Sequence, residues 1–133
     1  MESDEIEAGT LRVEDEGAIV YGLLFFEVKM AIIRSFRDLD VYVLGREHAK
    51  KIFLVSKAFP KEERYSLTDQ IRRCSRAVNA MIAEAWARRI YPAAFINKID
   101  EALGEAMETQ AWLDHALECG YLDRQQYREL NDA

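Results

Sequence analysis

Apolar residues from position 35 onward recur at steps of three and four, the spacing of an amphipathic α-helix. In residues 36–58 this stripe is formed by Leu39, Val43, Ala49, Ile52 and Phe53. Gly45 weakens the helix by up to about 1 kcal/mol relative to alanine without interrupting it. Pro60 disfavours helical geometry at the residue before it, so the first helix is predicted to end near Ala58.

Two longer segments carry a heptad seam, in which apolar residues alternate steps of four and three along one face. The first of them begins after Ser66, a suitable N-cap, and ends near Arg89. The next has Pro92 in its first turn and ends at Gly120, a typical C-cap. The predicted seam residues are Leu67, Ile71, Cys74, Val78 and Met81 in the former, and Phe95, Ile99, Ala102, Ala106 and Leu113 in the latter.

A short last helix is predicted after Gly120, with Asp123 as its N-cap. The two heptad helices, joined by a tight break, form an antiparallel hairpin, and the helix before them completes a bundle. The expected fold is therefore all-α. It is an antiparallel up-and-down four-helix bundle over residues 35–133, preceded by an N-terminal apolar extension over residues 1–34.

The extension contains the apolar run AIVYGLLFFEVKMAII, residues 18–33. Glu27 and Lys29 interrupt it, and it is shorter than the ~20 apolar residues that a membrane span needs. An acidic segment precedes it, which is unlike the basic start of a signal peptide. Short apolar runs do not distinguish strand from helix, and we favour helix. We expect this segment to pack on the bundle or on a neighbouring subunit, with no membrane partner.

Charge is unevenly distributed over the 133 residues, whose formal net charge is −6. Residues 1–34 hold 8 acidic and 3 basic side chains, residues 35–89 hold 7 and 12, and residues 90–133 hold 9 and 3. Only the middle third is basic, so any contact with nucleic acid should be local. The two cysteines form no spacing motif, which indicates reduced thiols and a cytoplasmic protein.

Residues that could support catalysis or bind a metal are few. His48 and His115 are the only histidines, and both are predicted to lie at the surface of helices. Cys74 lies on the heptad seam, where a free cysteine acts as a small apolar side chain. The chain has no HExxH motif, glycine-rich phosphate loop or CxxC pair. We therefore expect neither an enzyme nor a cofactor or metal site.

Basic side chains at the ends of QIRRCSRAVNAMIAEAWARR, residues 70–89, raise the main functional question. Arg72 and Arg76 are predicted to share a face opposite the apolar seam, where they would suit backbone phosphates. Glu84 and Arg88, four residues apart, are predicted to form a structural ion pair. The candidate RNA-binding residues are Arg72, Arg73, Arg76, Arg88 and Arg89. Structural ion pairing of the same arginines is the alternative.

Five segments together resemble one known family: SFRDLDVY, FPKEERYSLTDQIRR, IAEAWARR, FINKIDEALGEAMETQAWL and CGYL. In order and spacing they are similar to the four-helix bundle proteins called 23S rRNA intervening-sequence or S23-like proteins. The resemblance implies a ring-forming, typically pentameric bundle without known enzymatic activity. It also implies a link to ribosomal RNA through the position of such genes. A related branch comprises retroelement accessory variability proteins, which bind a reverse transcriptase.

The chain departs from this family where the second heptad helix usually has the run Ser-Ile-Pro-x-Asn-Ile-Ala-Glu-Gly. Residues 77–85 replace it with AVNAMIAEA, without the proline and the final glycine, which predicts a straighter helix. The predicted function is a non-enzymatic homo-oligomer that binds RNA or a ribonucleoprotein through its central basic face. The alternative is a protein-binding adaptor, such as an accessory subunit of a reverse transcriptase, without direct RNA contact.

Overall fold

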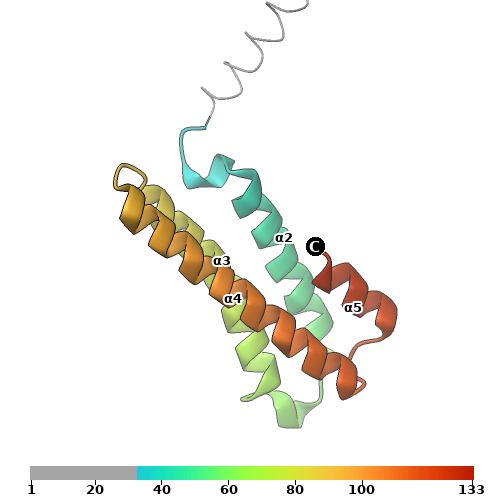
Figure 1. The fold of residues 1–133 in the computed structure, drawn as a ribbon. Helices are drawn as coiled ribbons and strands as arrows, with labels where there is room; N and C mark the ends of the chain where they lie inside the picture. Colours follow the sequence, from blue (N-terminus) through green and yellow to red (C-terminus); the bar gives the residue numbers. More distant parts are fainter. Residues whose placement is uncertain (1–32) are drawn as a thin grey trace, which may run out of the picture. The chain divides into compact units, whose positions relative to one another are not determined.

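The computed structural model describes residues 33–133, so the predictions for residues 1–32 lie outside the described residues. The elements are η1 (Phe36–Asp38), α2 (Asp40–Ser56), η2 (Lys61–Glu63), α3 (Leu67–Ala87), α4 (Pro92–Glu118) and α5 (Arg124–Asn131) (Figure 1). All are helical, which confirms the predicted all-α class. Within residues 33–133 no helix combines the length and apolar character that crossing a membrane requires.

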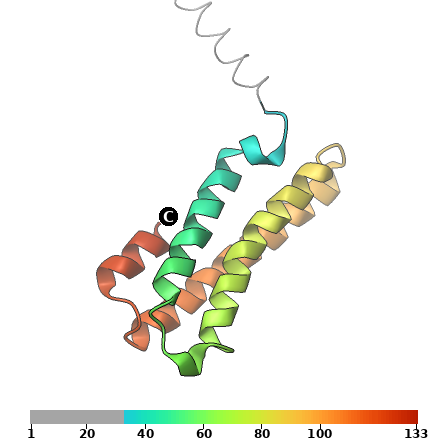
Figure 2. The ribbon, with the colours of Figure 1, turned by 180° about the vertical axis from the view of Figure 1, so that it is seen from behind.

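The helices form an antiparallel bundle, as predicted. α3 and α4 lie side by side over most of their length, and α2 packs along another flank of α3 (Figures 1 and 2). α5 contacts both α4 and α2. It has 8 residues against 27 in α4, about 12 Å against about 40 Å of helix. The fourth helix therefore covers only one part of the bundle and leaves the rest of α4 without a helix at that corner.

The main core lies where α5 closes the bundle. Its members come from every α-helix and from the two connections that flank this region. They are Ile52, Phe59, Leu67, Ile71, Leu113, Ala116, Leu122 and Leu130. Burying an isoleucine or leucine completely contributes roughly 1.5–3 kcal/mol, so this cluster fixes how α2, α3 and α4 meet.

Local sequence signals explain most of the helix ends. Asp123 caps α5 as predicted, with its side chain accepting a hydrogen bond from the Gln126 amide in a capping box. Pro92 opens α4, where its missing N–H is harmless. Gly120 follows α4 with φ 74°, and the next amide, at Tyr121, donates to Ala116. This bond belongs to a Schellman motif, which needs the left-handed conformation that glycine adopts without strain.

The cap of α3 differs from the prediction. The Ser66 side chain does not cap the helix but donates to Glu63 Oε2 at 2.5 Å. The same carboxylate oxygen accepts the first amide of the helix, Leu67 N, at 3.3 Å. Its other oxygen accepts from the Tyr121 hydroxyl at 3.0 Å, next to the start of α5. Glu63 therefore replaces Ser66 as the cap and ties the start of α3 to the α4–α5 connection.

Glu63 predicts a pH dependence of stability. The hydrogen bonds from Ser66, Tyr121 and Leu67 lower the pKa of Glu63 below its usual 4.5. This stabilisation is present above pH 4.5 and is lost as the pH falls through the lower folded-state pKa. Glu63→Gln should therefore unfold at a lower temperature than the wild type near neutral pH, and the difference should vanish in acid. Thermal melts across this range measure it, and a constant difference would contradict the assignment.

The predicted seam is buried along only part of its length. In α3, Leu67, Ile71 and Cys74 are buried, whereas Val78 and Met81 are half-buried. In α4, Ala102 and Leu113 are buried, and Phe95 and Ala106 are half-buried. Ile99 is 38% exposed, so it lies outside the buried bundle seam, and a place for it in an oligomer seam stays a prediction. A straight helix turns about 20° per heptad away from a strict seven-residue repeat, so a seam centred on Leu113 drifts off the contact by Ile99.

Candidate nucleic-acid interface

Three basic side chains surround the ring of Phe53, where α2 faces α3. The Arg72 guanidinium carbon lies 4.8 Å from the ring centroid, the Lys57 ammonium 4.9 Å and the Arg76 guanidinium carbon 5.5 Å. Since each lies within 5.5 Å of one point, any two are at most about 11 Å apart. Two like charges ~10 Å apart repel by roughly 0.4 kcal/mol in water and 1.7 kcal/mol at an effective dielectric constant of 20. A bound anion would relieve this repulsion.

Arg72 is held in position by the helix that it faces. Its Nε donates to Ser56 Oγ at 2.7 Å, and this hydroxyl donates in turn to the Phe53 carbonyl at 2.9 Å. Ser56 is 2% exposed, so the hydroxyl is a fixed part of the bundle. Because only Nε is used in this bond, the terminal nitrogens of the Arg72 guanidinium remain available to a ligand.

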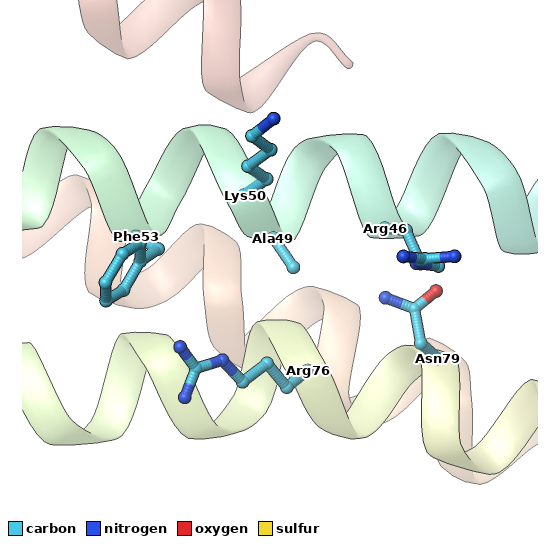
Figure 3. Close-up of a pocket in the computed structure, with 6 residues that line it drawn as sticks. All are labelled: Arg46, Ala49, Lys50, Phe53, Arg76 and Asn79. Atoms are coloured by element: carbon cyan, nitrogen blue, oxygen red, sulfur yellow. The ribbon is translucent and has the colours of Figure 1, made fainter.

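The cluster opens into a pocket of about 380 Å³ that follows the boundary between α2 and α3 toward the start of α2 (Figure 3). The Arg76 side chain extends toward Phe53, and the Arg46 guanidinium lies near Asn79 (Figure 3). The pocket is lined by Arg46, Ala49, Lys50, Phe53, Arg76 and Asn79. No carboxylate contributes to this lining. We call the five cations Arg46, Lys50, Lys57, Arg72 and Arg76 the basic groove.

Asn79 forms the inner wall of this pocket. The residue is 8% exposed, and its Oδ1 is buried without a hydrogen-bond partner among the described residues. A Cβ at Gly45 would overlap this oxygen, so a larger residue there would force the Asn79 side chain to shift. In the sequence Gly45 only lowers the stability of α2, whereas in the structure it packs against the Asn79 side chain.

Among residues 33–133 the groove cations have no acidic neighbour within the 4.0 Å of an ion pair. The ion pairs found within residues 33–133 join Lys98 to Glu84, Lys98 to Glu101, and His115 to Glu118. None of them involves a groove residue. Structural ion pairing, the alternative for Arg72 and Arg76, therefore finds no support in the described part of the chain.

The comparisons with known proteins identify the family. A family model described as 23S rRNA-intervening sequence protein matches residues 37–133. The chain belongs to this family. No match was found among curated proteins or among solved structures. The matched range includes both helices of the groove.

The family run that residues 77–85 replace lies within the second half of α3. The helix continues through it without a break from Leu67 to Ala87. Asn79 stands where family members usually have that proline. This chain thus places a polar amide against Gly45, at a position where the usual family residue has no side-chain polar group.

The five arginines predicted as one RNA-binding set occupy different parts of this family member. Arg72 and Arg76 share a face as predicted, but this face borders α2. Arg73 donates to Gln70 on the other flank, where Glu105 and Glu108 line the same pocket. Arg88 and Arg89 lie beyond α3, and the Arg89 guanidinium stacks on Trp86, 4.4 Å from its centroid. Within one chain the five arginines therefore do not share a single face, and RNA binding by them stays a prediction.

The other members of the basic groove were missed because they come from a different helix. Arg46, Lys50, Phe53 and Lys57 follow steps of four, three and four, which places them on one face of α2. This spacing was visible in the sequence. What was not visible is that this face lies against Arg72 and Arg76.

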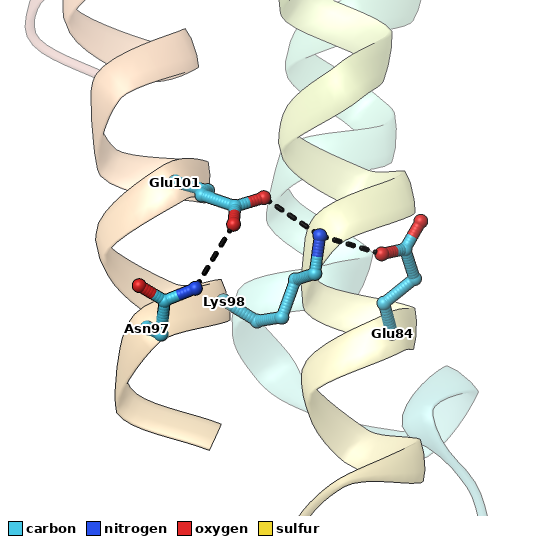
Figure 4. Close-up of polar contacts among 4 residues, drawn as sticks. All are labelled: Glu84, Asn97, Lys98 and Glu101. Carbon is cyan, nitrogen blue, oxygen red and sulfur yellow. Dashed lines mark hydrogen bonds and ion pairs between the residues drawn. The ribbon is translucent and has the colours of Figure 1, made fainter. Parts of the chain in front are cut away.

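The predicted pairing of Glu84 with Arg88 is also wrong. Glu84 Oε2 lies 2.9 Å from Lys98 Nζ of α4, and Lys98 also pairs with Glu101 at 2.7 Å (Figure 4). The hydrogen bond from Lys98 lowers the pKa of Glu84. Arg88 is the C-cap of α3 and forms no ion pair within 4.0 Å in the described residues, but its charge also lowers the pKa of Glu84.

The candidate catalytic residues have structural contacts. His48 is half-buried rather than at the surface, with Nε2 2.6 Å from the Leu130 carbonyl of α5. His115 is exposed, as predicted. Cys74 is 2% exposed and accepts from the Thr109 hydroxyl at 3.1 Å, and burial raises the pKa of its thiol. Among residues 33–133, no three His, Cys, Asp or Glu side chains gather as metal ligands would.

Proposed function

We propose that this member of the 23S rRNA-intervening sequence family is a non-enzymatic, homo-oligomeric, cytoplasmic protein that binds RNA through the basic groove. The observation that carries the proposal is the set of five cations along the boundary of α2 and α3, none of which has an ion pair with a carboxylate of the described residues. The family name refers to a sequence that intervenes in 23S ribosomal RNA, which makes RNA the first polyanion to test.

Phosphate contacts would dominate this binding. Phe53 is half-buried and already in contact with Lys57, Arg72 and Arg76, so its ring is poorly placed for stacking on bases. Cations that neutralise phosphates release counterions, and the resulting affinity is largely independent of base sequence. The groove therefore favours recognition of the RNA backbone.

Salt dependence tests the proposal. For a single strand, the slope of log K against log salt is about −0.7 per neutralised phosphate, so five contacts predict about −3.5. Fluorescence anisotropy with a short single-stranded RNA, from about 50 to about 200 mM salt, measures the slope. No binding at the low-salt end, or a slope near zero, would contradict RNA binding through the groove.

Self-association is supported by a second surface. Ile96, Leu103 and Met107 follow one stripe of α4, with 58%, 54% and 60% exposure. Leu103 and Met107 line a pocket of about 360 Å³ together with Val41 and Leu44 of α2. We call these five side chains the apolar stripe. Exposed apolar patches of this kind usually mark protein interfaces, and a second copy of the chain is the occupant that the ring-forming family suggests.

The same stripe supports the second candidate function, a protein-binding adaptor without RNA contact, such as an accessory subunit of a reverse transcriptase. An adaptor would use the apolar stripe for its partner and leave the basic groove empty. It predicts copurification with a protein and no RNA binding at moderate salt. The basic groove makes RNA binding the better supported function, because an adaptor of this kind would not need it.

A further inference from the structure

The basic groove is not uniform along its length. At one end Lys57, Arg72 and Arg76 converge on Phe53 without a carboxylate among the described residues that line the pocket. At the other end Lys50 points away from α3 (Figure 3), and the carboxylate of Glu47 lines a pocket together with Arg37, Arg46 and Lys50, so the net positive charge is lower there. A groove that only followed a strand would be expected to distribute its cations along the path. The concentration at one end indicates a ligand group of higher charge there.

The charge at that end exceeds what an internal phosphate supplies. Three cations meet within about 11 Å, and no carboxylate of the described residues lies within 4.0 Å of any of them. An internal phosphodiester carries one negative charge, whereas a terminal phosphate monoester carries nearly two at neutral pH. The monoester also offers more acceptor oxygens to two guanidinium groups, which bind phosphate in forked geometry.

The groove also ends beside this cluster. Lys57 directly follows the last residue of α2, and residues 57–66 form the connection to α3. The connection crosses from α2 to α3 at this end of the two helices (Figures 1 and 2). A strand that enters from the Arg46 end therefore reaches the connection just past Phe53, which suits a chain end better than a continuing backbone.

We propose that Lys57, Arg72 and Arg76 bind the terminal phosphate of a nucleic-acid strand, with the strand lying along the pocket toward Arg46 and Asn79. This inference rests on the proposed function of the groove and specifies its ligand. Ser56 is a positioning residue, because its buried hydroxyl fixes the Arg72 guanidinium without reaching the ligand. The Arg72 side chain is therefore held in place before binding, so its contact with the phosphate costs little side-chain entropy.

Matched single-stranded RNAs test the proposal on the full chain. One RNA carries a 5′-phosphate, one a 3′-phosphate and one only hydroxyl ends, with the label placed internally. The expected result is that one of the phosphorylated RNAs binds at least about tenfold more tightly than the hydroxyl RNA. Equal affinities with a steep salt dependence would overturn the terminal-phosphate site while leaving RNA binding intact. No binding of any of the three RNAs would overturn both.

Variants assign the preference to the cluster. Arg76→Gln and Lys57→Gln change exposed side chains, and each should reduce the preference for the phosphorylated RNA to about threefold or less. Arg89→Gln, outside the groove, should leave it unchanged. Thermal melts verify folding.

Inorganic phosphate should displace the phosphorylated RNA. If inorganic phosphate displaces RNA but all three RNAs bind with equal affinity, the site binds free phosphate alone. This result would overturn the proposal.

Discussion

Replacing Arg72 and Arg76 together with glutamate is expected to weaken RNA binding about 100-fold or more. Hydrogen bonds to charged groups contribute about 1.5–3 kcal/mol each, and two of them are lost. Each 1.4 kcal/mol corresponds to a factor of ten in affinity. The salt slope should also fall in magnitude by about 1.4, because two phosphates are no longer neutralised. Anisotropy titrations at several salt concentrations measure both quantities.

The matched control is Arg88→Glu with Arg89→Glu, which makes the same change in net charge outside the groove. Screening in physiological salt limits charge effects to about 8 Å, so this variant should lose only a few-fold in affinity. Equal losses in the two double variants would mean that net charge, rather than the groove, governs binding. Arg72 also bonds to Ser56, so its replacement removes a hydrogen bond within the protein. Arg76→Glu alone is therefore a second variant, since it removes none of the hydrogen bonds of the described residues.

Replacing Leu103 and Met107 together with glutamate is expected to convert the oligomer into a monomer. Both side chains are more than half exposed on the apolar stripe, so the charges are tolerated in the separate chain but not in a buried interface. Sedimentation should shift from a multiple of 15.4 kDa to 15.4 kDa itself. Helix content should be unchanged by circular dichroism.

The matched control for this variant is Leu54→Glu, which places a charge at an exposed leucine of α2 outside the apolar stripe. It should leave the oligomer intact. A wild-type chain that sediments as a 15.4 kDa monomer at micromolar concentration would contradict self-association. RNA binding through the groove could still hold in that case, because the groove lies within one chain.

The helices were predictable because their signals are local. The three- and four-residue steps, Pro92, Asp123 and Gly120 each act within a turn or two of their own position. Ile99 lies outside the buried bundle seam because small angular errors accumulate along a long helix. The cap formed by Glu63 was not predicted, because it depends on η2, a short turn that brings the carboxylate back to Leu67.

The groove was only half predictable, for a different reason. Arg72 and Arg76 share a face by spacing alone, but the partner of that face depends on how α2 is rotated and shifted against α3. That rotation is set by packing around Ile52 in the core. The bond between His48 and Leu130 joins residues 82 positions apart, which no local pattern predicts.

Hydrogen–deuterium exchange of the full chain, with and without a short single-stranded RNA, tests the central claim most directly. RNA in the basic groove should slow exchange in peptides that cover Arg46–Lys57 and Arg72–Asn79. The exchange rate of peptides from α4 around Leu103 should not change when RNA is added. Protection confined to α4, or to the connection around Arg88 and Arg89, would contradict binding between α2 and α3.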